Sequence, residues 1–382
     1  MRQFALRYGE TIVYFGDGAL NRLGGHFSAH RKILVVTGGR SAKVSGALDD
    51  AAKALTDAGI TWWVYDGVFP NPTDRVVDEI AGAAKERGAE AILAIGGGSV
   101  IDSAKFAAVV ACSGGRAREY LKGAKNPSCS LPVYAVNLTH GTGSEVDRYS
   151  VANVEEEGLK IGLGTVYPRA SADDPAYLRT LPAQQTRYTA IDALYHALES
   201  ATSTARNPMA ASLAREAVEI ISRWLPAALE DPDDLEARAN LLYAAAVAGI
   251  AIDNSVTHIV HSLEHVLSGL NPKLPHGAGL ALLGPRCMRY VHMALPDESA
   301  MVLRPLDPGI SPTADHAARA EEAVRKFQEE VGLEESLSDY GFSEGELEEL
   351  TSRAMEVIAG DAWLVPFEVK PEIVRDVLRS AL

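Results

Sequence analysis

Aspartate and histidine side chains in the second half of the chain have a spacing that could hold a metal ion. Asp192 and His196 stand at positions i and i+4, as do His261 and His265, and His276 follows shortly afterwards. Residues at this spacing point from one face of a helix, so two helices could each present a ligand pair to one ion. Carboxylate and imidazole ligands suit Zn²⁺ or Fe²⁺. The pattern therefore predicts a metal site carried by helices.

Histidine is concentrated in this region. The chain has 10 histidines, of which His258, His261, His265 and His276 fall close together. A lone histidine on an apolar helix is more often a hydrogen-bonded core residue than a ligand. A buried aspartate beside several imidazoles, however, would be costly to satisfy without a cation. At this point His265 could be a neighbour rather than a ligand, and His258 could face away from the site.

Two glycine-rich turns are candidate phosphate-binding sites. The apolar run 89–95 predicts a buried strand that leads into Gly96-Gly97-Gly98-Ser99, and residues 100–112 predict the helix that follows. A strand predicted at 33–37 leads in the same way into Gly38-Gly39-Arg40-Ser41. Glycines let the backbone approach a ligand, and free N–H groups at a helix start attract phosphate oxygens. Either turn alone could be a simple connection, but two together favour a nucleotide.

A third glycine-rich segment supplies hydroxyl groups and bare backbone rather than charge. It follows a strand predicted at 132–136 and runs Leu138-Thr139-His140-Gly141-Thr142-Gly143-Ser144-Glu145. Such a segment could close around a ribose or a nicotinamide. By itself it would be an ordinary turn.

Composition and charge exclude several classes of function. The chain has 382 residues, 47% hydrophobic and 7% aromatic, and a formal net charge of −15. The charge argues against nucleic acid as a partner. No apolar run approaches the roughly 20 residues that cross a bilayer, so neither a membrane span nor a signal peptide is expected and the expected location is cytoplasmic. Cys112, Cys129 and Cys287 are scattered, so we expect buried thiols and no disulfide.

The order of predicted elements indicates two domains. Predicted strands at 33–37, 62–65, 90–95 and 132–136 alternate with predicted helices at 44–58, 73–87 and 99–112, which is typical of a parallel sheet. Later stretches predict only helices, among them 183–203, 208–229, 233–254, 256–269, 313–331, 343–359 and 371–381. The sequence thus predicts an α/β Rossmann-like domain over 1–181 and an all-helical, metal-binding domain over 182–382.

These motifs together resemble the iron-containing (group III) alcohol dehydrogenases, whose architecture is shared with the dehydroquinate synthases. The resemblance covers nearly the whole chain, through Pro70-Asn-Pro-Thr73, Gly96 to Lys105, Gly141-Thr-Gly-Ser-Glu145, Ile191 to Glu199 and Leu274-Pro-His-Gly277. It implies that Asp192, His196, His261 and His276 bind the metal, Fe²⁺ or Zn²⁺. It also implies that His265 is a catalytic proton relay near the substrate.

The same resemblance implies a nicotinamide cofactor. The implied cofactor-binding residues are Gly38, Gly39, Arg40 and Ser41, Asn71, Gly96 to Ser99 with Asp102, Thr139 and Thr142, and Lys160. NAD-preferring relatives often carry an acid after the first strand, whereas this chain has Gly38 to Ser41 there, so NADP(H) is expected over NAD(H). Many relatives have other residues at Leu138, His140 and Asp147, which we expect to bring an imidazole and an acid near the nicotinamide.

The expected function is a metal-dependent alcohol dehydrogenase or aldehyde reductase acting on a small primary alcohol or aldehyde, as a homodimer. A polyol dehydrogenase or a hydroxyacid-oxoacid reductase on the same fold is the alternative. Two other classes stay open. A dehydroquinate synthase-like lyase would need basic residues for a phosphorylated acid, and few lie near the ligands in sequence. A non-catalytic nucleotide- or metal-binding module would show no turnover.

Overall fold

In the computed structural model, which describes residues 3–382, the chain divides into two compact units. Met1 and Arg2 lie outside the described residues. They begin the N-terminal segment in which we expect no signal peptide. The first unit contains residues up to Pro182 together with 231–242, and the second contains 183–230 and 243–382. The sequence-based division at 181 differs in the segment 231–242. This segment joins the first unit, in which its Arg238 donates a hydrogen bond to His140.

A 7-stranded sheet forms the centre of the first unit, with the order β1-β2-β9-β6-β5-β3-β4. Its neighbouring strands are parallel except for β1 and β2. The strands are β1 (Phe4–Tyr8), β2 (Thr11–Phe15), β3 (Lys32–Thr37), β4 (Thr61–Tyr65), β5 (Ala91–Gly96), β6 (Val133–Asn137) and β9 (Ala170–Asp173). A separate antiparallel pair consists of β7 (Tyr149–Val154) and β8 (Leu159–Gly164).

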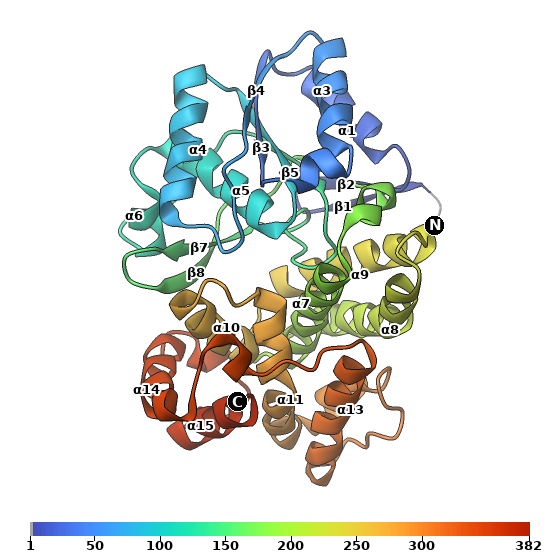
Figure 1. Cartoon of the computed structure of the whole chain (residues 1–382), viewed down its shortest axis with the longest axis vertical. Coiled ribbons are helices and arrows are strands. Elements are labelled where there is room, and N and C mark those ends of the chain that lie inside the picture. Colours follow the sequence, from blue (N-terminus) through green and yellow to red (C-terminus); the bar gives the residue numbers. More distant parts are fainter. Residues whose placement is uncertain (1–2) are drawn as a thin grey trace. The chain divides into compact units, whose positions relative to one another are not determined.

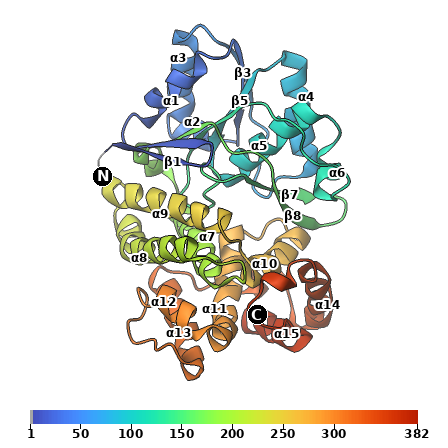
Figure 2. The same ribbon diagram turned by 180° about the vertical axis from the view of Figure 1, so that it is seen from behind.

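Helices cover both faces of this sheet. In Figures 1 and 2, α4 and α5 lie on one side of the strands and α1 and α3 on the other. The helices are α1 (Ala19–Phe27), α2 (Ser41–Val44), α3 (Ala47–Asp57), α4 (Asp74–Arg87), α5 (Gly98–Ser113) and α6 (Ala117–Leu121). The hydroxyl of Thr73 caps α4 by accepting from the Val76 amide, as a threonine before a helix can. A parallel sheet covered on both faces explains why β5 and β6 are buried at every residue.

The second unit is helical throughout its described elements. It contains α7 (Ala183–Thr202), α8 (Pro208–Glu230), α10 (Ile259–Leu270), α11 (His276–Ala294), α12 (Pro296–Leu303), α13 (Ala317–Glu330), α14 (Leu347–Ile358) and α15 (Pro371–Ser380), with short 3-10 turns between them. Helix α9 (Leu235–Asp253) begins in the first unit and ends in the second. Among the described helices, only α9 has the length and apolarity to cross a membrane, but 78% of its apolar window is buried inside the protein, as in a core helix.

The expectation for the cysteines was wrong for two of the three. Cys112 and Cys129 form a disulfide with their Cα atoms 5.6 Å apart, and both residues are exposed. The chain folds back here because the Ser113 hydroxyl, at the end of α5, donates to the Cys129 carbonyl and accepts from the Cys129 amide. Only Cys287 is a buried free thiol among the described residues.

Candidate metal and cofactor sites

The structure brings the four predicted metal ligands together within the second unit. Asp192 and His196 come from α7, His261 from α10, and His276 is the first residue of α11. The Nε2 atoms of the three histidines lie 3.4, 3.5 and 3.6 Å from one oxygen, Oδ1 of Asp192. Ligand atoms about 2.1 Å from a tetrahedral ion would lie about 3.4 Å apart. Each of the three Nε2 atoms therefore lies from Oδ1 of Asp192 at about the distance that separates two ligands of one ion.

Helix packing positions His276. Residue 277 is glycine because a Cβ there would overlap the backbone carbonyl of Tyr188 on α7. The start of α11 can therefore approach α7 closely, and His276 reaches Asp192 one turn further along that helix. A larger residue at 277 would push this ligand away from the others.

Polar atoms left without hydrogen-bond partners point to a cation at this place. Oδ1 of Asp192 and Nε2 of His261 are buried and have no such partner. Burying unsatisfied polar groups costs free energy, which a divalent ion between them would offset. The ligand atoms of Asp192, His261 and His276 also all lie within 4.8 Å of one another, which is close enough for one ion to contact all three. The residues present therefore fit a divalent metal.

Two buried glutamates that the sequence analysis did not single out hold the ligand rings from behind. Oε2 of Glu199 lies 2.5 Å from Nδ1 of His261, and Oε2 of Glu264 bonds Nδ1 of His276. Both glutamates have no exposed surface. A carboxylate that accepts from Nδ1–H leaves Nε2 free to bind an ion and fixes the ring orientation. Helical spacing could have indicated both glutamates, because Glu199 follows Asp192 by seven residues and Glu264 follows His261 by three, which places each on the same helix face as a ligand.

The electrostatics of this cluster also favour a cation. Burial lowers the pKa of His196 to about 4, so that ring is neutral at pH 7 and its nitrogen can donate electrons to a metal. Burial alone would lower the pKa of His261 too, but the adjacent carboxylates of Asp192 and Glu199 raise that pKa to about 9. The carboxylates thus attract positive charge to the site. A metal ion would displace the proton of His261.

His265 and His258, the other two histidines of the group close together in sequence, have different surroundings. The His265 ring is half-buried, with its centroid 6.4 Å from that of His261 and 5.7 Å from that of His276. The ring therefore lies beside two of the four candidate ligands. His258 is buried and points to Glu199, with Nδ1 3.3 Å from Oε1, and its Nε2 lies 3.0 Å from the Thr202 hydroxyl. His258 therefore faces Glu199 and not the candidate ligands.

The glycine turn of the first unit has the geometry of a ligand cradle. Strand β5 ends at Gly96, and α5 begins at Gly98. A Cβ on Gly97 would lie 2.6 Å from Thr139, and one on Gly98 would overlap Thr142. Thr139 and Thr142 therefore stand directly against the turn. Backbone N–H groups at the start of a helix, with two hydroxyls beside them, suit a phosphorylated ligand.

The remaining predicted cofactor residues lie in two places. Gly38 directly follows the last residue of β3, and Arg40 and Ser41 are exposed at the start of α2. Asn71, with a φ of 55°, accepts a hydrogen bond from the Asn153 side chain through its carbonyl at 3.2 Å. Asn153 is in turn the cross-strand partner of Lys160. Asn71 therefore contacts β7, and Lys160 lies on the paired strand β8.

Three predicted features of the first unit are buried rather than open to a ligand. Asp102 accepts from the Ser144 hydroxyl and from the Val151 amide at 3.0 Å. His140 has no exposed surface, and its Nε2 accepts from Arg238 at 3.4 Å. Burial and Arg238 lower the pKa of His140 to about 3, so its ring is neutral. Asp147 is also buried and pairs with Lys105. His140 and Asp147, which we expected to bring an imidazole and an acid near the nicotinamide, both turn inward to cationic partners.

Comparison with known proteins gives the family. Residues 10–175 match the model of the iron-containing alcohol dehydrogenases, and residues 186–382 match the C-terminal model of the same family. The chain belongs to the iron-containing alcohol dehydrogenase family. It is an alcohol dehydrogenase of this type, for which the family implies a divalent metal and a nicotinamide cofactor.

Individual relatives cover nearly the whole chain. A long-chain primary alcohol dehydrogenase of Thermoanaerobacter ethanolicus is 37% identical, over 99% of this chain and 97% of the relative. The structure of an archaeal halo-thermophilic alcohol dehydrogenase from a Red Sea brine pool is 29% identical, with a TM-score of 0.92, over 100% and 99% of the two chains. An NADH-dependent butanol dehydrogenase of Thermotoga maritima is 30% identical, with a TM-score of 0.90 and 98% of each chain covered.

Proposed function

We propose that this protein transfers hydride between NADP(H) and a small primary alcohol or aldehyde, at an Fe²⁺ or Zn²⁺ ion held by Asp192, His196, His261 and His276. The observation that carries the proposal is the convergence of three Nε2 atoms on one carboxylate oxygen of Asp192. The family assignment favours a dehydrogenase over the dehydroquinate synthase-like alternative. A homodimer in the cytoplasm completes the proposal.

The chemistry divides between the bound groups and the chain. When bound, the ion polarises the substrate oxygen and the nicotinamide donates or accepts hydride. Glu199 and Glu264 keep the rings of His261 and His276 in the tautomer that presents Nε2. The glycine turn 96–99 and the hydroxyls of Thr139 and Thr142 hold the cofactor. His265, half-buried beside the ligands, moves a proton to or from the substrate oxygen.

The preference for NADP(H) rests on the end of β3. From Gly38 to Leu48 the chain contains no acid, and Arg40 and Lys43 are both exposed there. Cations and glycine N–H groups favour a 2′-phosphate, which an acid would repel. The Thermotoga butanol dehydrogenase is described as NADH-dependent, so the preference must be measured for this chain.

The experiment compares kcat/KM for NADPH and NADH in the unmodified protein and in Gly39→Asp. Nothing lies within 4 Å of a Cβ built on Gly39, whereas a Cβ on Gly38 would lie 2.9 Å from the Val68 carbonyl. The φ of 50° at Gly39 strains any L residue, but aspartate is among the few residues that adopt this left-handed conformation. We expect NADPH to be preferred and Gly39→Asp to lower its kcat/KM about tenfold or more while NADH changes little. A clear NADH preference of the unmodified protein would overturn the cofactor assignment. No turnover of any alcohol or aldehyde with either cofactor would overturn the activity.

A further inference from the structure

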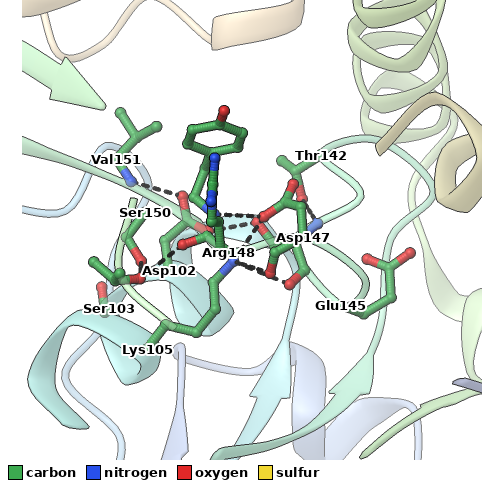
Figure 3. A network of polar contacts seen from close by, with 12 residues as sticks. Asp102, Ser103, Lys105, Thr142, Glu145, Asp147, Arg148, Ser150 and Val151 are labelled. Carbon is green, nitrogen blue, oxygen red and sulfur yellow. Dashed lines mark hydrogen bonds and ion pairs between the residues drawn. The ribbon is translucent and has the colours of Figure 1, made fainter. Parts of the chain in front are cut away.

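The segment 138–147, called here the threonine loop, is held in place by one turn of helix α5. The loop joins β6 to β7, and its Thr139 and Thr142 stand against the glycine turn. Asp102 and Lys105 lie on α5, which begins at that turn, and both point to the loop (Figure 3). The helix that starts at the candidate phosphate site therefore also fixes the loop beside it.

Lys105 makes the central contacts of this arrangement. Its side chain has no exposed surface, and its ammonium group donates to the Ser144 carbonyl at 3.0 Å, the Asp147 carbonyl at 3.3 Å and Oδ1 of Asp147 at 3.0 Å. These three bonds use all three donors of the ammonium group. A buried charge with each donor used has one favourable position. Lys105 thus holds the end of the threonine loop at two residues, Ser144 and Asp147.

The carboxylates complete the network. Oδ1 of Asp147 also accepts from the Tyr149 amide at 2.8 Å, which ties the loop to the first residue of β7. Asp102 accepts from the Ser144 hydroxyl and, through Oδ2, from the Val151 amide at 3.0 Å. Figure 3 shows these groups converging between α5 and the loop. Loss of the Asp147 carboxylate would leave the Lys105 ammonium and the Tyr149 amide each without one acceptor.

We propose that Asp147, through Lys105, is a positioning residue that holds Thr142 against the glycine turn before the cofactor arrives. This inference rests on the proposed role of the glycine turn and the threonine loop in binding the cofactor. Asp147 touches neither the cofactor nor the substrate in this scheme. A preformed loop loses less conformational entropy on binding. We therefore expect residue 147 to change the affinity for the cofactor and not the rate of the chemical step.

The test measures cofactor affinity directly, by calorimetry with NADPH or NADH and no substrate. Asp147→Ala should raise the dissociation constant about tenfold or more, because it removes two hydrogen bonds, one of them charge-assisted. Asp147→Asn keeps an acceptor for both partners and should stay within about threefold of the unmodified protein. In turnover, KM for the cofactor should rise in Asp147→Ala while kcat changes little.

Thr11→Val is the matched control. The Thr11 hydroxyl is buried in the same unit and donates to the Pro168 carbonyl at 2.7 Å, far from the loop in sequence. This variant should lower the melting temperature without changing cofactor affinity. If Asp147→Ala lowers the melting temperature and leaves affinity unchanged, or if Asp147→Asn is as weak as Asp147→Ala, the inference is wrong.

Hydrogen exchange in the unmodified protein tests the inference even if Asp147→Ala does not fold. The amides of Tyr149 and Val151 should be protected without cofactor, and fast exchange there until cofactor is added would contradict a preformed loop. The two proposals fail separately. If the unmodified protein binds no nicotinamide nucleotide, the proposed function fails, whereas normal binding that does not depend on residue 147 defeats only this inference.

Discussion

Glu199 contacts His261 directly behind the candidate metal ligands, with 2.5 Å between Oε2 and Nδ1. The other oxygen of Glu199 accepts from the Val260 amide at 2.7 Å, so the carboxylate is itself fixed by the start of α10. The opposite nitrogen of the His261 ring lies 3.5 Å from Asp192. Helix α7 thus provides both a ligand and the support for a ligand on another helix.

Removal of the Glu199 carboxylate should weaken metal binding, although all four candidate ligands remain. Glu199→Ala is expected to lower metal affinity by roughly 10- to 100-fold, the usual effect of losing a carboxylate behind a histidine ligand. Competition with a chelator of known affinity measures it. Glu219→Gln, an exposed glutamate on α8, is the control and should behave like the unmodified protein. Unchanged metal affinity in Glu199→Ala would show that the contact does not orient the ring.

His265 should act in turnover and not in metal binding. We expect His265→Ala to retain its metal and to bind cofactor normally, yet to lose roughly 10²- to 10⁴-fold in kcat, as expected when a general acid or base is removed. The pH dependence of kcat should change as well. Loss of the metal in this variant, or normal turnover with an unaltered pH profile, would remove His265 from the mechanism.

Two buried carboxyl groups, Glu145 in the threonine loop and Asp173 at the end of β9, should make folding stability depend on pH. Glu145 and Asp173 have no exposed surface, and their side-chain oxygens have no hydrogen-bond partners. Burial raises the pKa of Glu145 from 4.5 to about 8, and burial together with Glu145 raises the pKa of Asp173 well above its ordinary value.

The folded protein therefore binds more protons than the unfolded chain between about pH 4.5 and 8, and stability should fall as the pH rises through that window. Glu145→Gln cannot ionise, so its melting temperature relative to the unmodified protein should increase from about pH 5 to about pH 8. Scanning calorimetry of both proteins with metal bound measures the difference. A difference that stays constant with pH would contradict the assignment.

The disulfide between Cys112 and Cys129 should stabilise the first unit. It closes a loop between residues 17 apart in sequence, for which chain entropy gives about 3 kcal/mol. Reducing agent should therefore lower the denaturant midpoint of the unmodified protein, and the Cys112→Ser/Cys129→Ser variant should show the lower midpoint with or without reductant. Two free thiols in the purified, unreduced protein at these positions would contradict the bond.

The sequence indicated those elements whose pattern is strong over several residues. Strands β3, β5 and β6 are continuous apolar runs because both faces of the sheet are covered. Strand β9 has the sequence Ala-Ser-Ala-Asp, which carries no strand propensity, and becomes a strand only because β2 and β6 lie on either side of it. The bounds of helix α11 were not predicted within the all-helical region, because its glycines and Pro285 interrupt a helical pattern that tertiary packing maintains.

The residues of the candidate metal site could be predicted from the sequence, whereas the contacts of His140 and Asp147 in the first unit could not. Spacing and family resemblance together indicated Asp192, His196, His261 and His276, since ligands have a characteristic type and period. The inward orientation of His140 could not be predicted, because it depends on Arg238, which lies far away in sequence and meets it only in the folded unit. Likewise, the pairing of Asp147 with Lys105 follows from the path of the threonine loop over α5.

The metal content of purified protein tests the central claim most directly. Elemental analysis of the unmodified protein, His261→Ala and His276→Ala should be made side by side, with Glu219→Gln as the control and circular dichroism to show that each variant is folded. We expect one divalent ion per chain in the unmodified protein and the control, and a sharp loss of both metal and activity in the two histidine variants. Full metal occupancy in either folded histidine variant would contradict that claim.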